Sequence, residues 1–309
     1  MKQLSRRDFA RGAGLAAGAA GSLAAQQGPR PLPEGPRSTP MICLFSKHLA
    51  KLQYAELGPV LKGLGFEGCD LTVRPQGHVL PERVAADLVR AIEGIRGEGV
   101  DVPMITTALT GGGDPTARPI IALAGRMSVP YFKVGYWHYE PNESIDAKLA
   151  LVRRDFAALV SLGRAYGIAA GFHNHSGNYV GEAVWDTREI LAGLDPKWAG
   201  YYFDPCHATA EGGVGGWQVS MRMALPRIKM VALKDFYWAK EGGKWRMTMC
   251  PIGEGMVDWS AVFHMLAAAK FTGPLSLHLE YNPQDELNAI AKDLAFVKKQ
   301  VAAAYGNRT

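Results

Sequence analysis

An alternation of short apolar runs with longer amphipathic stretches begins at residue 41 and continues almost to the carboxyl end of the chain. Eight runs resemble buried β-strands, and apolar residues recur at helical spacing after each run. The expected strands are 41–45, 66–73, 102–107, 131–136, 168–173, 200–203, 228–233 and 275–279. The expected helices are 54–63, 82–97, 116–127, 146–166, 187–194, 217–225, 259–269 and 285–304. Eight strands that are each followed by a helix predict a single-domain (β/α)8 barrel over residues 41–305, rather than an open doubly wound sheet.

Such a barrel gathers its functional side chains at one end, where the loops after the carboxyl ends of the strands meet. Polar residues follow every expected strand, and seven of the eight histidines fall at strand ends. This clustering predicts a functional site rather than a merely solvated rim. The strand-end residues that we single out are Arg74, His78, Lys133, His138, His173, His175, Asp204, His207, Lys234, His278 and Glu280.

The densest of these motifs is His173-Asn174-His175, which ends the fifth expected strand. Alternate side chains of a strand share a face, so the two imidazoles should point the same way. Two imidazoles on one face suit a metal site or a proton-transfer site. A pair of hydrogen-bonded loop histidines is the structural alternative.

A second motif, Asp204-Pro205-Cys206-His207, places a carboxylate at a strand end and an imidazole one turn later. With His173 and Glu280 these side chains form a mixed nitrogen and oxygen set that suits a divalent cation. We therefore predict metal ligation by His173, Asp204, His207 and Glu280, with Mn²⁺ favoured and Zn²⁺, Mg²⁺ or Co²⁺ compatible. A helix cap or an ion pair is the structural alternative for Asp204.

Lys234 and Asp235 end the seventh expected strand. A lysine at this position can orient a substrate oxygen or stabilise an enolate, while an ion pair with Asp235 or Asp204 is the structural alternative. The following segment, 236–258, is long for a barrel loop and contains Trp238. We expect it to form a flap with an aromatic surface for a sugar ring.

Five motifs together resemble the sugar phosphate isomerase/epimerase family: His-Asn-His, Asp-x-x-His, Leu-Lys-Asp, Pro-x-Gly-x-Gly and a glutamate after the last strand. That family has the xylose isomerase-like TIM barrel and includes inosose dehydratases, hydroxypyruvate isomerases and ketose epimerases. The resemblance covers about residues 41–303 and implies one metal ligand from each of the last four strands. Two positions depart from the pattern: His173 stands where many relatives have a glutamate, and Ala232 where many have a histidine.

These features predict a metal-dependent enzyme that abstracts a proton beside the carbonyl of a sugar or keto-sugar. Isomerisation or epimerisation is the favoured reaction. The alternatives are a lyase acting on a 3-keto-glycoside or an inosose-like compound, and a non-catalytic sugar-binding barrel. The sequence shows neither a glycine-rich phosphate loop nor a Gly-x-Ser-x-Gly elbow, which disfavours nucleotide-dependent and serine acyl-transfer chemistry. We expect Glu280, Lys234 and His175 to be catalytic. We expect the substrate to be bound by Arg74, His78, Lys133, His138, His278 and Trp238.

Residues 1–25 have the pattern of a targeting signal. Ser5-Arg6-Arg7-Asp8-Phe9 resembles a twin-arginine export signal, and an Ala- and Gly-rich stretch follows it. We expect a proline-rich linker over 26–40 and a periplasmic or otherwise exported protein, with no membrane partner after signal removal. The formal net charge of +5 falls to about +2 without residues 1–25, which predicts no nucleic-acid partner. A homo-oligomer is left open.

Overall fold

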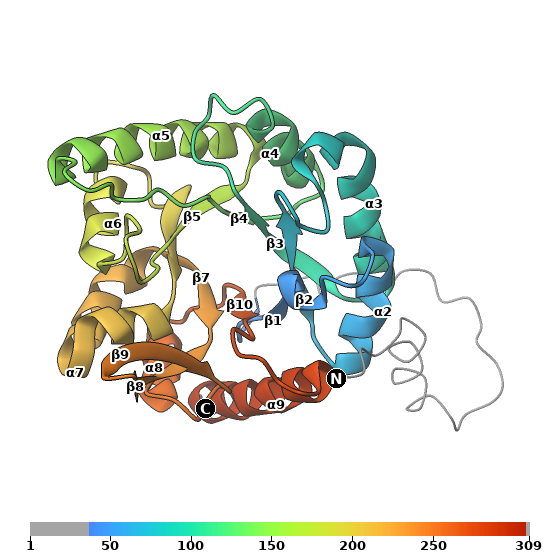
Figure 1. Ribbon diagram of the computed structural model, residues 1–309. Helices are drawn as coiled ribbons and strands as arrows, with labels where there is room; N and C mark the ends of the chain where they lie inside the picture. The colour runs from blue at the N-terminus through green and yellow to red at the C-terminus, as the bar shows by residue number, and fades with distance from the viewer. Residues whose placement is uncertain (1–36, 307–309) are drawn as a thin grey trace, which may run out of the picture.

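The computed structural model describes residues 37–306 as a closed ring of strands inside a ring of helices (Figure 1). The predicted export signal and most of the predicted linker lie outside these residues. Eight parallel strands close in the order β1-β10-β7-β6-β5-β4-β3-β2. The predicted (β/α)8 barrel is therefore confirmed.

The barrel strands lie close to their predicted positions. They are β1 (Ile42–Phe45), β2 (Gly68–Val73), β3 (Asp101–Thr107), β4 (Tyr131–Lys133), β5 (Ala169–His173), β6 (Ala199–Phe203), β7 (Ile228–Leu233) and β10 (Leu275–Leu277). The helices that follow them are α2 (Tyr54–Leu64), α3 (Val84–Gly97), α4 (Ala117–Arg126), α5 (Ile145–Tyr166), α6 (Val184–Leu191), α7 (Pro205–Ala224), α8 (Trp259–Ala268) and α9 (Glu286–Tyr305). None of the described helices is long and apolar enough to cross a membrane.

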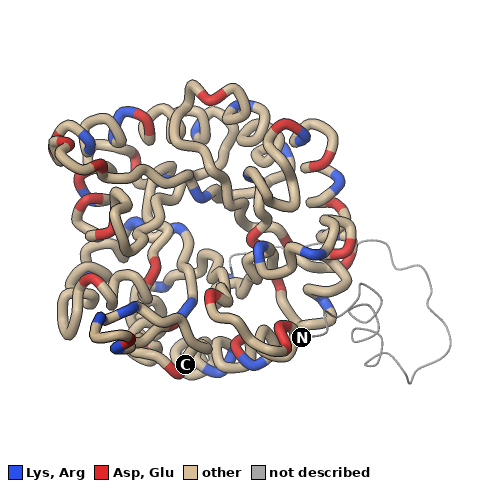
Figure 2. The backbone as a smooth tube through the Cα atoms, viewed as in Figure 1, with Lys and Arg blue, Asp and Glu red and all other residues tan. Residues whose placement is uncertain are grey.

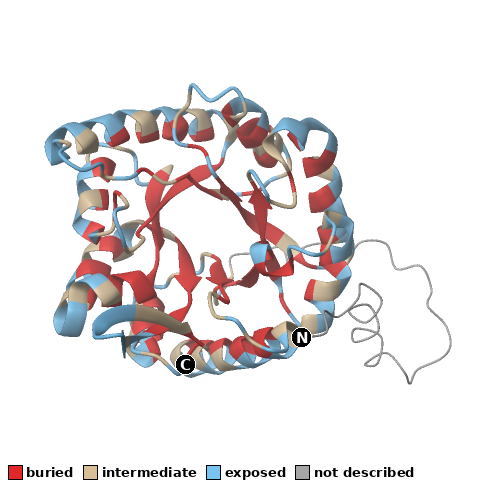
Figure 3. Cartoon of the chain, viewed as in Figure 1, coloured by how far each residue is buried: buried red, intermediate tan, exposed pale blue. Residues whose placement is uncertain are grey.

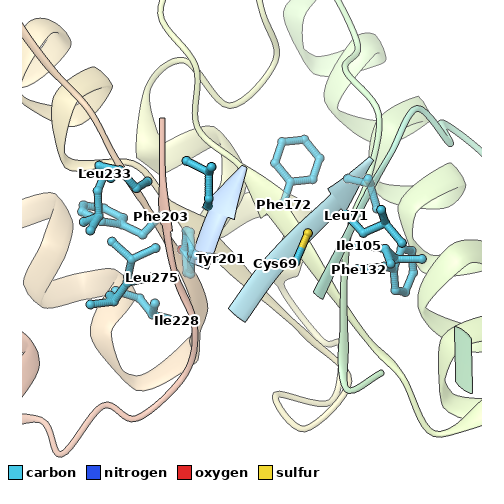
Figure 4. Close-up of a cluster of buried hydrophobic side chains, with 14 of the residues drawn as sticks. Cys69, Leu71, Ile105, Phe132, Phe172, Tyr201, Phe203, Ile228, Leu233 and Leu275 are labelled. Atoms are coloured by element: carbon cyan, nitrogen blue, oxygen red, sulfur yellow. The ribbon is translucent and has the colours of Figure 1, made fainter. Parts of the chain in front are cut away.

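The hydrophobic core has two parts, because successive residues of a strand face alternately outward and inward. The larger part lies between the strands and the helices, where Leu71, Ile105 and Phe132 belong to it (Figure 4). Figure 3 shows buried residues along the strands and on the inward faces of the helices. A smaller cluster of Met104, Tyr202, Met230 and Ala232 forms separately from it. These residues lie on barrel strands, so we place this second cluster in the barrel interior.

Charged residues of both signs are interspersed around the ring of helices (Figure 2). The four cysteines are buried, and none of them forms a disulfide with another described residue. The described part of the chain therefore presents neither a single-sign face in this view nor a covalent cross-link.

The helix α7 begins earlier than the sequence pattern predicts. The helix begins at Pro205, directly after Asp204, whose side chain accepts a hydrogen bond from the backbone N–H of His207. A carboxylate cap with proline in the first turn is a strong helix start. A kink at Gly213 (φ 57°) divides the helix, and the second half matches the predicted one.

The long segment after β7 is also ordered. It forms an antiparallel hairpin of β8 (Asp235–Glu241) and β9 (Lys244–Cys250). The carboxylate of Asp235 accepts hydrogen bonds from the backbone N–H groups of Phe236, Gly253, Gly255 and Val257, and from the indole of Trp259. Gly255 has to be glycine, because a Cβ there would collide with Asp235 and the Phe236 carbonyl. One buried carboxylate thus ties both ends of the hairpin to the barrel.

Candidate active site

A cavity of about 370 Å³ lies where the carboxyl ends of the barrel strands meet. The aliphatic part of its lining includes Met247 and Met249 of β9, so the hairpin contributes one wall. Asp204 is fully buried and contacts several of the lining side chains. The predicted residues that line the cavity are Arg74, Lys133, His173, His175, His207, Lys234, His278 and Glu280.

Three predicted substrate-binding residues do not line this cavity. The imidazole of His78 is hydrogen-bonded to the Thr72 hydroxyl and the Leu49 carbonyl, so it holds the loop after β2. His138 is exposed and packs on the Tyr179 ring. Trp238 is 41% exposed on β8, opposite Met247, and therefore shares the cavity-facing side of the hairpin but lies beyond the cavity. The strand-end position places a residue at the right end of the barrel but does not fix where its side chain points.

Asp204 is the centre of the predicted motif cluster. Its Oδ2 atom lies 3.0 Å from Lys234 Nζ, 3.1 Å from His173 Nε2 and 3.7 Å from His207 Nε2. Burial acts to raise the pKa of Asp204, but the Lys234 ammonium and His207 outweigh it and leave this pKa below its ordinary value. Asp204 is therefore an ionised carboxylate that serves as a cap and a charge partner at once.

Tyr136 extends this cluster into the cavity. Its hydroxyl lies 2.8 Å from His173 Nδ1, while His173 Nε2 faces the Asp204 carboxylate. A carboxylate only accepts, so Nε2 carries the ring proton and Nδ1 accepts from the tyrosine hydroxyl. Burial, together with the nearby Lys234 charge, lowers the pKa of His173 and keeps it neutral. The result is a hydrogen-bonded chain Asp204–His173–Tyr136 that ends at the cavity wall.

The sequence did not single out Tyr136, because the apolar run 131–136 was expected to be strand throughout. β4 ends at Lys133, so Tyr136 lies on the strand-to-helix loop. A tyrosine three residues after a strand-end lysine was the signal that could have found it.

His175 and His207 form a second pair of imidazoles. Their ring centroids are 4.0 Å apart, and His175 Nδ1 lies 2.9 Å from the Ser176 carbonyl oxygen. The carbonyl can only accept, so Nδ1 is protonated and Nε2 keeps its lone pair. Burial and the Lys234 charge lower the pKa of His175 to about 4. His175 is thus neutral near pH 7 and able to accept a proton.

Glu280 lies with different partners. Its carboxylate is 2.9 Å from Lys47 Nζ and 3.8 Å from His278 Nδ1. Burial acts to raise the pKa of Glu280, but His278, Lys234 and Lys47 outweigh it and lower this pKa strongly. A carboxylate held ionised in this way is a hydrogen-bond acceptor and a weak base.

The predicted four-ligand metal centre does not fit this arrangement. The described residues contain no group of three or more His, Cys, Asp or Glu side chains that could hold a metal ion. His173, Asp204 and His207 meet, but the Lys234 ammonium is already paired with the shared Asp204 oxygen. Ala232, buried in the barrel interior, supplies no imidazole, and Glu280 is paired with Lys47. The donor set is therefore that of an ion pair with two imidazoles, not of a divalent-cation site.

With the barrel and its site described, comparison with known proteins defines the family. A family model described as xylose isomerase-like TIM barrel matches residues 60–300. The chain belongs to the xylose isomerase-like TIM barrel family. Comparison with curated proteins finds no match.

Solved structures with the same fold include a sugar epimerase and a probable dehydratase. An apo 3-keto-D-glucoside 4-epimerase from E. coli has a TM-score of 0.68 and 14% identity, covering 84% of this chain and 100% of that one. A probable 3-DHS dehydratase from Bacillus anthracis has a TM-score of 0.65 and 13% identity, covering 84% and 98%. A family protein from Mycobacterium smegmatis, in complex with magnesium, has a TM-score of 0.64 and 16% identity, covering 86% and 98%. At these identities the similarity shows the fold.

Proposed function

We propose that this protein is a carbohydrate enzyme that transfers a proton at a carbon beside the carbonyl of a sugar or keto-sugar. The observation that carries the proposal is the placement of two proton-transfer groups in one cavity. These groups are His175 and the Asp204–His173–Tyr136 chain, and Lys234 lines the same cavity. Structural relatives that are named as sugar epimerases support the substrate class.

His175 is the base in this proposal. Its Nδ1–H is fixed by the Ser176 carbonyl, so the Nε2 lone pair is available to take the proton from carbon. The ring changes from neutral to cationic as the substrate becomes an enediolate. The two new charges are opposite and close, so each stabilises the other.

Lys234 stabilises the negative charge that develops on the substrate oxygen. An ammonium has three N–H donors, and Asp204 takes one of them at 3.0 Å. The other donors are held in place before the reaction begins, which is the condition under which electrostatic stabilisation is most effective. Because the donor set does not fit a divalent ion, no step is assigned to the predicted metal. Glu280 accepts hydrogen bonds from substrate hydroxyls in this scheme.

Tyr136 completes the reaction by moving the second proton. Its hydroxyl donates to His173 Nδ1, so its oxygen can take the proton of a substrate hydroxyl while its own proton passes to His173, whose cationic form Asp204 stabilises. His175 then returns the proton that it took from carbon. Delivery to carbon gives isomerisation or epimerisation. Delivery to a departing oxygen gives β-elimination, the predicted lyase alternative.

The test is exchange of the substrate's α-hydrogen with D₂O, followed by NMR over a panel of keto-sugars. Tyr136→Phe should slow turnover by about 10²–10⁴-fold with little change in substrate affinity. Tyr179→Phe is the matched control, because the Tyr179 ring packs on Tyr136 but does not line the cavity. Exchange and turnover absent for every keto-sugar, or a Tyr136→Phe variant as fast as wild type, would contradict the proposal.

Export through the twin-arginine pathway is a separate proposal. It is supported by Arg6 and Arg7 in Ser5-Arg6-Arg7-Asp8-Phe9. Replacement of both arginines by lysine should leave folded protein in the cytoplasm, as measured by cell fractionation. Normal export of this variant would argue against the signal.

A further inference from the structure

We propose that the cavity selects a sugar that carries an anionic group, either a carboxylate or a phosphate, and that Lys133 and Arg74 bind this group. The inference rests on the proposed function for the sugar part of the ligand. For the anionic part it rests on two cations that line the cavity and have no acidic partner.

Lys133 ends β4 and is only 3% exposed. Its ammonium lies 3.3 Å from the centroid of the Tyr136 ring. No described residue forms a hydrogen bond or an ion pair with this ammonium. A buried charge without a partner is costly, so structures rarely keep one that has no use.

Arg74 follows β2 and lines the same cavity. Its guanidinium stacks over the Phe45 ring at 5.7 Å, and its buried Nε atom has no hydrogen-bond partner. Arg74 is also near enough to Lys133 for its charge to contribute, after burial, to lowering the pKa of the lysine. The basic groups of Arg74 and Lys133 therefore line the same cavity, and neither of them forms an ion pair with an acidic side chain of the described residues.

The acidic groups around the cavity are already engaged. Asp204 is paired with Lys234, and Glu280 with Lys47. Asp70, whose charge also acts on Lys133, is fully buried and accepts hydrogen bonds from Thr106, Ser276 and Tyr202. Pairing within the cavity thus leaves Lys133 and Arg74 without an ion-pair partner.

An anion on the substrate matches this surplus. The arginine fork and a lysine ammonium together suit carboxylate and phosphate oxygens, which they bind by charge-assisted hydrogen bonds. A cavity of about 370 Å³ is at the small end for ligand sites and suits one sugar ring with its substituent. The anion would lie on the β2–β4 side, which leaves the carbonyl end for Lys234 and His175.

The test is calorimetric binding to the full chain, with D-glucuronate, D-glucose 6-phosphate and D-glucose as probes. One or both acids should bind about 10–100-fold more tightly than glucose, as charge-assisted hydrogen bonds predict. The acid that binds more tightly, glucuronate or glucose 6-phosphate, shows whether the site prefers a carboxylate or a phosphate. Equal affinity for all three probes would overturn the inference.

Lys133→Met and Arg74→Met should each abolish most of the preference for the acid. Lys62→Met is the matched control, since it removes the same charge from an exposed ion pair with Glu98 on the outer helices. Lys133→Met should also melt at a higher temperature than wild type, because it removes an unpaired buried charge. A variant that melts lower and keeps the preference would make Lys133 a structural residue and refute its assignment.

Failure of this inference differs from failure of the proposed function. The binding assays need no turnover, so a preference for acids can be found in a protein that exchanges no hydrogen. Conversely, α-hydrogen exchange with neutral keto-sugars and no preference for acids would keep the reaction and remove the anion site.

Discussion

Two buried lysines at the mouth of the barrel differ in one respect, the presence of an acid. Lys234 follows β7 and pairs with Asp204, while Lys133 ends β4 with only the Tyr136 ring against its ammonium. Burial acts to lower both pKa values, yet Asp204 raises that of Lys234, whereas that of Lys133 is lowered. The comparison teaches that one residue type at similar strand ends serves two purposes. A paired lysine is a fixed local charge, and an unpaired one is a site for a ligand.

The largest expected effect comes from removing Asp204, the acid that distinguishes Lys234 from Lys133. Asp204→Asn leaves Lys234 buried without a partner and should reduce the free energy of unfolding by about 3–5 kcal/mol. Asparagine can still cap α7, so the loss reports mainly on the charge pair. Chemical denaturation measures it, and adding Lys234→Met should restore most of the stability. A loss that the second substitution leaves unchanged would show that the pair is not its cause.

A smaller effect of opposite sign is expected at the other lysine. Lys133→Met should raise the free energy of unfolding by about 1–2 kcal/mol, in the range typical of stabilising substitutions. Because the folded state lowers the pKa of Lys133 below its ordinary 10.5, the wild-type protein loses stability as the pH falls below 10.5. The advantage of methionine should therefore be absent above that pH and grow below it. Denaturation of both proteins between pH 7 and 11 measures the trend; an advantage independent of pH would contradict it.

The smallest expected effect concerns metal. Mn²⁺ should not change the melting temperature, because Lys234 already pairs with the carboxylate that a cation would need. A site filled at one hundred times its dissociation constant would stabilise the protein by about 2.7 kcal/mol, which thermal melts resolve easily. Stabilisation that Asp204→Asn abolishes would restore Asp204 as a ligand and overturn the comparison.

The sequence predicts the barrel well because each strand and helix carries its own periodic pattern. It also places His175, Lys234 and Glu280 at the correct end of the barrel, since strand polarity alone decides that. It does not show that Lys234 pairs with Asp204 while Lys133 has no acid. Those facts depend on side-chain directions and on neighbours from other strands.

The differences between the expected and the observed positions of side chains follow the same division. His78 and His138 lie at the expected end but turn away from the cavity, and Tyr136 was hidden within an apolar run. The metal prediction rested on residue types without their geometry, and the Mn²⁺ melting experiment tests it. His173 and Ala232 indicated the departure from the family pattern, but only the structure shows the Lys234 ammonium against the Asp204 carboxylate.

Asp235 closes the hairpin at its base. Its carboxylate binds the chain at the beginning of the hairpin and again just after its end, so one side chain fixes both ends of the insertion. We expect that residues 237–246, which precede the cavity-lining Met247 and Met249, can be lengthened, shortened or exchanged without disturbing a barrel strand. The hairpin is thus a segment in which mutation can change which molecules reach the cavity, while the polar side chains on the barrel strands keep their positions.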